Sequence, residues 1–198
     1  YGLPEGMVDP ATMVIPVSGT REALFMVALA AVPERKNGRK PVVLMPNPFY
    51  QVYLGAAVTA GAEPVLVPAD RQNGFLPNYA ALPDDILDRT ALAYYCSPAN
   101  PQGAIAPMDT IRQLVELARA HDFLLVSDEC YSELYYGDPP TGAAEACAAL
   151  GDTAAGAMRN VVAMNSLSKR SSAPGLRSGF VAGDADLIRR FARLRDYG

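Results

Sequence analysis

Short runs of apolar residues along the chain alternate with longer segments in which apolar residues recur every three or four positions. The first pattern is typical of strands buried in a sheet, and the second is typical of amphipathic helices. The short runs predict strands at residues 14–17, 42–45, 65–67, 91–97, 123–129, 160–166 and 178–183. The periodic segments predict helices at residues 18–32, 50–60, 108–120 and 187–195, with Ser18 as the cap of the first.

Most of the predicted strands are nearly continuous in Val, Leu and Ala, so we expect both of their faces to be buried. This pattern predicts an α/β fold with an open, mostly parallel sheet of about seven strands and helices on both faces. Only a loop of about ten residues separates the last two strands, which is too short for a helical crossover and predicts one antiparallel strand. In such sheets, ligands bind beyond the carboxyl ends of the strands.

Composition narrows the class of protein. The chain has 198 residues, of which 50% are hydrophobic and 19% are charged, as expected for one folded domain. Its net charge of −4 and the lack of a basic stripe argue against nucleic-acid binding. The longest apolar run, residues 23–32, is too short to cross a membrane. Three cysteines without CxxC spacing predict free thiols and a cytoplasmic location, and the single histidine excludes a His-rich metal site.

Polar residues follow the predicted strands at the edge where ligands are expected. Ser18, Gly19 and Thr20 begin a helix after the first strand. Free backbone N–H groups beside hydroxyls suit a phosphate, although a plain serine cap explains the same residues. Asn100 follows the fourth strand between two prolines, where it either forms a turn or offers its amide to a ligand.

The fifth predicted strand ends in Asp128 and Glu129, with Tyr131 shortly after. Paired acids are compatible with a metal site or with glycoside hydrolysis. However, adjacent residues of a strand point to opposite faces, so these two carboxylates are not expected to converge. A carboxylate at the end of an apolar run is costly unless it meets a cation or a donor. Asp128 and Tyr131 are therefore the more plausible functional pair.

The loop after the sixth predicted strand carries Ser166, Ser168 and Lys169, and Arg177 follows eight residues beyond the lysine. An amine near a buried acid and a phosphate-binding helix start is in the right place to form a Schiff base. Tyr50 belongs to an aromatic cluster after the second strand, where it either stacks on a flat ligand or serves packing alone.

Five segments occur in an order that is specific as a set: SGTREAL, NPFYQVY, SPANPQG, SDECYSEL and SLSKRSSAPGLRSGF. In this order they resemble the class I pyridoxal-phosphate aminotransferases, which have the aspartate aminotransferase fold. The resemblance covers nearly the whole chain. Within the class, the wording of the segments is most similar to the N-succinyldiaminopimelate aminotransferases of bacterial lysine synthesis.

The resemblance implies pyridoxal 5′-phosphate as cofactor and gives each residue a role. Lys169 would form the internal aldimine and then move the α-proton. Asp128 would keep the ring nitrogen protonated, Tyr131 and Asn100 would bind the phenolic oxygen of the ring, and Tyr50 would stack on its face. The phosphate would be held by the remaining polar residues of the set: Ser18, Gly19, Thr20, Ser166, Ser168 and Arg177.

The resemblance also implies a ping-pong reaction that moves an amino group, as from glutamate, to a keto acid such as N-succinyl-2-amino-6-ketopimelate. Alternatives are another aminotransferase, a lyase or a decarboxylase with the same cofactor, a cofactor-binding regulator, or an inactive fragment that binds the cofactor. Residues 1–198 are expected to be the large cofactor-binding domain, without the N-terminal segment and small C-terminal domain of the family. The arginine for the substrate α-carboxylate would then lie outside this chain, and the full-length protein would be a homodimer.

Overall fold

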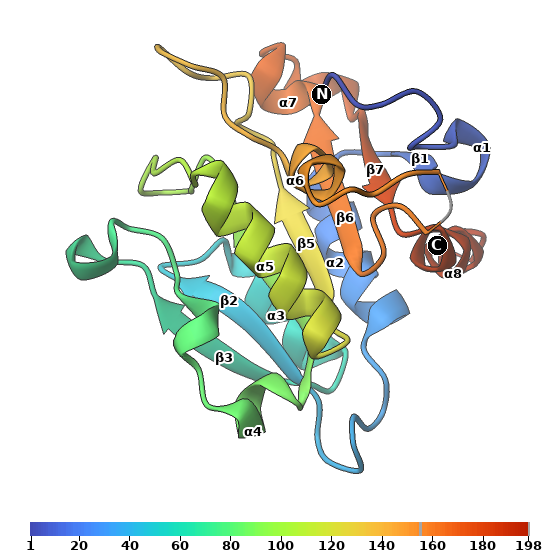
Figure 1. Ribbon diagram of the computed structural model, residues 1–198. Helices are drawn as coiled ribbons and strands as arrows, with labels where there is room; N and C mark the ends of the chain where they lie inside the picture. Colours follow the sequence, from blue (N-terminus) through green and yellow to red (C-terminus); the bar gives the residue numbers. More distant parts are fainter. Residues whose placement is uncertain (155, 198) are drawn as a thin grey trace.

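The strands of the chain form one sheet in a computed structural model that describes residues 1–154 and 156–197. Within these residues the sheet has seven strands in the order β1-β7-β6-β5-β4-β2-β3 (Figure 1). Their bounds are β1 (Val14–Val17), β2 (Val42–Asn47), β3 (Glu63–Pro68), β4 (Thr90–Cys96), β5 (Leu124–Asp128), β6 (Val161–Ser166) and β7 (Gly179–Gly183).

Strand β7 runs antiparallel to both of its neighbours, β1 and β6, whereas the other strand pairs are parallel. The predicted α/β fold with a mostly parallel sheet is therefore confirmed, and β7 is the antiparallel strand. The connection from β6 to β7 differs from the plain loop expected from the sequence. It contains one helical turn, α7 (Leu167–Arg170), and a short 3-10 turn at Pro174–Leu176.

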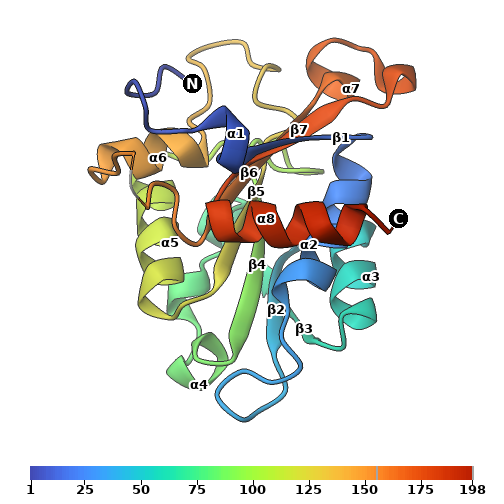
Figure 2. The ribbon, with the colours of Figure 1, turned by 90° about the vertical axis from the view of Figure 1, so that its right-hand side faces the viewer.

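Helices cover both faces of the sheet. Figure 2 shows α5 and α6 on one side of it and α2 and α3 on the other, with α8 next to α2. The helices not bounded above are α1 (Pro10–Met13), α2 (Thr20–Ala31), α3 (Gln51–Thr59), α4 (Asp84–Leu87), α5 (Met108–Ala120), α6 (Ala143–Ala149) and α8 (Ala185–Arg195).

The two faces of the sheet carry two separate hydrophobic cores. Strand β4 contributes to both, because successive side chains point to opposite faces. Leu92 and Tyr94 are buried with α2 and α3, while Ala93 and Tyr95 are buried with α5 and α6. Full burial of one large apolar side chain contributes about 1.5–3 kcal/mol, so this double burial fixes the sheet between its helices. A fixed sheet in turn holds the polar residues at its carboxyl edge.

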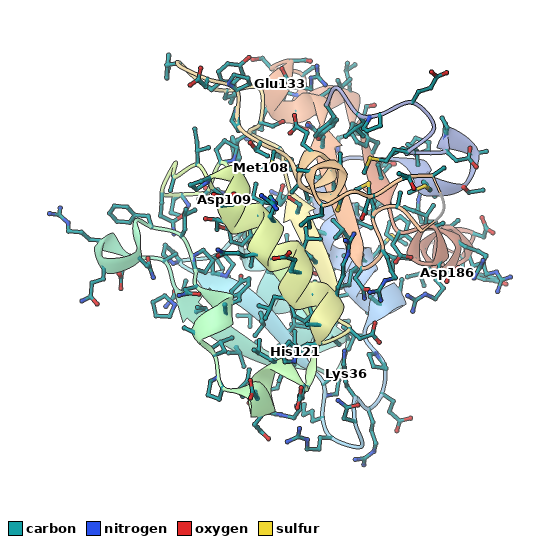
Figure 3. The ribbon with its side chains drawn as sticks, in the orientation of Figure 1. Lys36, Met108, Asp109, His121, Glu133 and Asp186 are labelled. Carbon is teal, nitrogen blue, oxygen red and sulfur yellow. The ribbon has the colours of Figure 1, made fainter. Side chains whose placement is uncertain are left out.

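The predicted helix at residues 108–120 is confirmed as α5. Its apolar stripe, which includes Ile111, Leu114 and Val115, is buried against the sheet. His121 follows the last turn, at the end of α5 opposite Met108 and close to Lys36 (Figure 3). Its Nδ1 lies 3.0 Å from Oδ1 of Asp88, so the histidine takes part in a surface contact.

The start of α2 corrects the prediction that Ser18 caps this helix. Gly19 is the N-cap residue, no side chain caps the helix there, and Ser18 is exposed. The backbone explains the difference, because Gly19 has φ +94° and ψ 155°, a conformation that is essentially restricted to glycine. The helix therefore begins at Thr20, with its N–H groups left free of a side-chain cap.

Candidate functional site

A pocket of about 560 Å³ opens at the carboxyl edge of the parallel strands. The first turn of α2, the segment after β5 and the α7 region form its walls. It brings together most of the predicted site residues: Thr20, Tyr50, Asn100, Asp128, Tyr131, Ser168, Lys169 and Arg177. The other three, Ser18, Gly19 and Ser166, contact these residues without lining the pocket.

Gly19 and Arg177 meet at one end of the pocket. The Arg177 guanidinium donates to the carbonyl oxygens of Ser18, at 2.9 Å, and Pro174, at 3.1 Å. A Cβ on Gly19 would lie 3.0 Å from Cζ of Arg177 and closer still to Nη2. Glycine thus lets a positive side chain approach the free N–H groups at the start of α2. Both features favour an anion, and the geometry suits a phosphate.

Ser166 and Ser168 form the wall next to this end. Ser166, the buried last residue of β6, accepts a hydrogen bond at its Oγ from the Ser168 N–H, at 3.0 Å. Its hydroxyl also lies 2.9 Å from the Ser168 hydroxyl. These contacts cap α7 and fix Ser168 beside Lys169 at the edge of the pocket.

Asp128 ends β5 and is 5% exposed. Tyr53 donates a hydrogen bond of 2.6 Å to its Oδ2, and the Cys130 N–H donates to Oδ1 at 3.4 Å. Burial raises the pKa of the Asp128 carboxyl, and the donated hydrogen bonds lower it in part. Among the described residues, Asp128 has no cationic partner within salt-bridge distance.

Glu129 points to the other face of the sheet, as the alternation in a strand predicts. It accepts hydrogen bonds from the Tyr1 hydroxyl at 2.5 Å, the Ser127 hydroxyl at 2.9 Å and the Ala143 N–H at 2.8 Å. The two adjacent acids therefore do not share a ligand. Asp128 belongs to the pocket, whereas Glu129 ties the first residue of the chain and the start of α6 to the sheet.

Lys169 projects from α7 into the pocket, with Nζ 5.8 Å from the ring centroid of Tyr131. Within the described residues no carboxylate pairs with Lys169, and the side chain of Asn100 makes no hydrogen bond. Burial is the main cause of a raised pKa for the Tyr131 hydroxyl, which stays protonated and able to donate. An amine, an amide and a phenol thus face the same space.

Three residues of the pocket were not predicted as site residues from the sequence. Tyr53 bonds Asp128, Cys130 lies with Sγ 2.8 Å from the Thr20 hydroxyl, and Arg21 donates to the Tyr50 hydroxyl at 2.6 Å. Local signals existed for two of them. Arg21 directly follows the predicted helix start, and Tyr53 lies one helical turn after Tyr50. Cys130 gave none, because a thiol between Asp128 and Tyr131 is chemically ambiguous.

A ligand with a phosphate at one end and a protonated ring nitrogen at the other fits this pocket. Arg177 and the start of α2 offer positive charge where Gly19 permits close approach. Asp128 offers a buried carboxylate that, within the described residues, lacks a cation. A buried carboxylate of this kind is stabilised by a positively charged partner. Pyridoxal phosphate carries both groups, and Lys169 lies where its aldehyde would need an amine.

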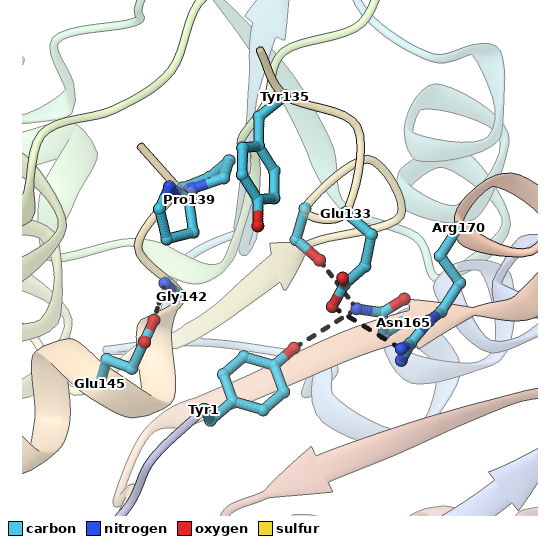
Figure 4. Close-up of a pocket in the computed structure, with 10 residues that line it drawn as sticks. Tyr1, Glu133, Tyr135, Pro139, Gly142, Glu145, Asn165 and Arg170 are labelled. Carbon is cyan, nitrogen blue, oxygen red and sulfur yellow. Dashed lines mark hydrogen bonds and ion pairs between the residues drawn. The ribbon is translucent and has the colours of Figure 1, made fainter. Parts of the chain in front are cut away.

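A second pocket, of about 280 Å³, lies across the wall formed by Ser132 and Arg170. Figure 4 shows Asn165 in it, donating to the Ser132 hydroxyl at 2.9 Å, with an ion pair between Glu133 and Arg170 at 3.7 Å. Its acids and amides bond to one another. None of the site residues predicted from the sequence lines this pocket.

Two further searches of the described residues were negative. They contain no group of three or more His, Cys, Asp or Glu side chains that could hold a metal ion. In the same part of the chain, no helix has the length and apolar character that crossing a bilayer requires.

Comparison with known proteins identifies the family. Residues 4–197 match the model of the family described as aminotransferase class I and II. The LL-diaminopimelate aminotransferase of Moorella thermoacetica is 32% identical over 188 residues, which cover 95% of this chain and 45% of that protein. A crystal structure of an aminotransferase from Neisseria meningitidis superposes with a TM-score of 0.87 at 39% identity, over 96% of this chain and 47% of that one.

A structure described as a probable N-succinyldiaminopimelate aminotransferase, from Thermus thermophilus, gives a TM-score of 0.84 at 27% identity. It is matched over 96% of this chain and 48% of its own. The chain therefore spans about half the length of the relatives that it matches. Family match and fold agree, and the chain belongs to the class I and II aminotransferases, a family that depends on pyridoxal phosphate.

Proposed function

We propose that this chain is the cofactor-binding domain of a longer aminotransferase that uses pyridoxal 5′-phosphate. The observation that carries the proposal is the convergence of Lys169, Asp128 and Arg177 on one pocket from three separate segments. Each supplies a group that the cofactor needs: an amine, a carboxylate and a phosphate-binding cation. Membership of the family and coverage of about half the length of its relatives support the same view.

The residues that would hold the cofactor fall into three groups. Gly19, Thr20, Ser166, Ser168 and Arg177 hold the phosphate through backbone N–H groups, hydroxyls and a guanidinium. Asp128 pairs with the ring nitrogen, while Asn100 and Tyr131 bind the oxygen on the ring. Tyr50 forms one wall of the pocket, against which the flat ring lies.

Pyridoxal phosphate supplies an electron-withdrawing ring that stabilises the carbanion formed when an amino acid loses its α-proton. The chain supplies the proton transfers around it. The amine of Lys169 takes the proton from the α-carbon and returns it to the cofactor side. Asp128 keeps a proton on the ring nitrogen, because a buried carboxylate without a counter-charge strongly favours a cationic partner. Tyr53 holds that carboxylate in place through its hydroxyl.

The proposed substrates are glutamate as amino donor and N-succinyl-2-amino-6-ketopimelate as acceptor, in the synthesis of diaminopimelate and lysine. The segment wording supports the succinylated acid, as does the likeness to the Thermus thermophilus protein. The relatives named LL-diaminopimelate aminotransferase support the free acid as the second candidate. We further propose a homodimer in the cytoplasm. Free thiols at Cys96, Cys130 and Cys147 support a reducing compartment.

Spectroscopy of the naturally encoded polypeptide, loaded with pyridoxal phosphate, tests the proposal. Glutamate should change the visible absorption of the bound cofactor, and a keto acid should restore it. Succinylated and free forms of the acceptor, compared at equal concentration, then separate the two candidate substrates. A cofactor spectrum that responds to no amino donor would reject the proposed function. Release of ammonia or CO2 in place of a keto acid would favour a lyase or decarboxylase.

A further inference from the structure

Arg21 lines the same pocket as Lys169, yet the proposed function gives it no part in holding the cofactor. It lies in the first turn of α2, directly after Thr20, and it is exposed. We propose that Arg21 binds a second carboxylate of the substrate. The enzyme would thereby select amino acids and keto acids that carry a carboxylate besides the one on the α-carbon. This inference rests on the proposed aminotransferase function and names its substrate class.

The Arg21 side chain is anchored at one edge and open at the other. Its Nε donates to the Tyr50 hydroxyl at 2.6 Å, and its Cζ lies 5.8 Å from the Tyr50 ring centroid. Within the described residues, Nη1 and Nη2 make no hydrogen bond and the guanidinium has no acidic partner. Two adjacent amino groups form a planar fork that matches the two oxygens of a carboxylate.

The charges in the pocket leave this arginine unbalanced. Its lining contains three cations, Arg21, Lys169 and Arg177, and one acid, Asp128, among the described residues. In the proposed function Arg177 meets the phosphate, Asp128 meets the ring nitrogen and Lys169 joins the cofactor. Arg21 remains for an anion that arrives with the substrate. Both proposed substrates have such an anion, since glutamate and the succinyl group each carry an additional carboxylate.

Arg21 has two other conceivable roles, as a second phosphate ligand and as a support for Tyr50. Arg177 already occupies the phosphate end, where its guanidinium lies against Gly19. Tyr50 already packs edge-on against Tyr53, with ring centroids 5.8 Å apart and an interplanar angle of 89°. Both roles are thus filled by other residues, and each makes a different prediction for binding.

The test measures binding of glutarate, a dicarboxylate, and butyrate, a monocarboxylate, to the naturally encoded polypeptide loaded with cofactor. Isothermal titration calorimetry gives both dissociation constants without turnover. We expect tighter binding of glutarate than of butyrate. Arg21→Gln should weaken glutarate binding about 10- to 100-fold, the range for loss of a charge-assisted pair, and leave butyrate unchanged. Arg21→Lys should recover part of the loss, because it keeps the charge without the fork.

Two variants complete the design. Arg189→Gln removes an exposed arginine of α8 and should change neither constant. Tyr50→Phe removes only the hydroxyl anchor and should weaken glutarate binding less than Arg21→Gln. Equal weakening of both acids by Arg21→Gln would overturn the proposal, as would weaker binding of pyridoxal phosphate with glutarate unaffected. If glutamate leaves the cofactor spectrum of the unmutated protein unchanged, the aminotransferase function fails, while the glutarate selectivity still decides the role of Arg21.

Discussion

The hydroxyl of Tyr53 donates a hydrogen bond of 2.6 Å to Oδ2 of Asp128, and both side chains are buried. Tyr53 is itself held by Tyr94, whose ring stacks on it with centroids 4.4 Å apart and an interplanar angle of 10°. The acid at the bottom of the pocket is thus positioned by an aromatic pair between the sheet and α3. This arrangement keeps a carboxylate ionisable in surroundings that disfavour its charge.

Replacement of Tyr53 by Phe should make stability more sensitive to pH. Burial already raises the pKa of Asp128 in the folded state, so stability falls as pH rises from the ordinary aspartate pKa through the raised one. The Tyr53 hydroxyl lowers this pKa, and its loss extends the fall to higher pH. We expect the cofactor-free variant to lose about 1–3 kcal/mol of unfolding free energy at neutral pH, measured by urea denaturation.

Tyr79→Phe is the matched control for this prediction. The Tyr79 hydroxyl donates to the carbonyl oxygen of Tyr94 at 2.6 Å in an equally buried place. Its removal also leaves a buried acceptor unpaired, but that acceptor does not titrate. We expect a loss of stability that is the same at about pH 4 and about pH 8. A pH-independent loss in Tyr53→Phe as well would contradict the assignment of Asp128 as the titrating group.

Asp128→Asn should separate cofactor chemistry from folding. The change removes the buried charge and keeps the shape, so the unfolding free energy of the cofactor-free protein at neutral pH should not fall. The glutamate-dependent change in cofactor absorption should slow by about 10²–10³-fold, the scale for loss of one preorganised charge-stabilising group. Stopped-flow absorption measures it. A variant that reacts at the original rate would show that Asp128 does not serve the ring nitrogen.

Gly19→Ala should damage both stability and phosphate binding. The backbone at Gly19 has φ +94°, and an added Cβ would displace the Arg177 guanidinium. We expect a cost of about 1–3 kcal/mol in unfolding free energy and weaker binding of pyridoxal phosphate. Gly55→Ala is the control, since a Cβ at this position in α3 meets nothing within 4 Å. It should be neutral or stabilise by up to about 1 kcal/mol, and equal costs for both variants would refute the close-approach explanation.

Arg177→Lys should retain the charge at the phosphate end and lose the geometry. A lysine cannot bond both the Ser18 carbonyl and two oxygens of a phosphate from one planar group. We expect pyridoxal phosphate to bind about 10-fold more weakly, and the unphosphorylated pyridoxal to bind as before. Fluorescence or absorption titration with both compounds gives the comparison. An equal effect on the two would mean that Arg177 does not recognise the phosphate.

The sequence predicted those features that follow from local pattern. Residues 108–120 are helical because the apolar stripe has the helical period, and β7 is antiparallel because its connection is short. The cap at Ser18 was wrong because the backbone at Gly19, and not side-chain propensity, decides where α2 begins. The contacts of Tyr53 with Asp128 and of Arg21 with Tyr50 join segments 75 and 29 residues apart, which periodicity does not encode.

The most direct measurement is the identity of the lysine that carries the cofactor. The chain contains three lysines, of which Lys36 contacts the carbonyl oxygens of His121 and Asp122 at the opposite edge of the sheet, and Lys40 lies near it in sequence. Borohydride reduction of the protein with bound pyridoxal phosphate, followed by peptide mass spectrometry, should place the adduct on Lys169. Lys169→Ala should abolish both the adduct and the visible absorption band. An adduct on any other lysine, or a band that survives in Lys169→Ala, would contradict the proposed site.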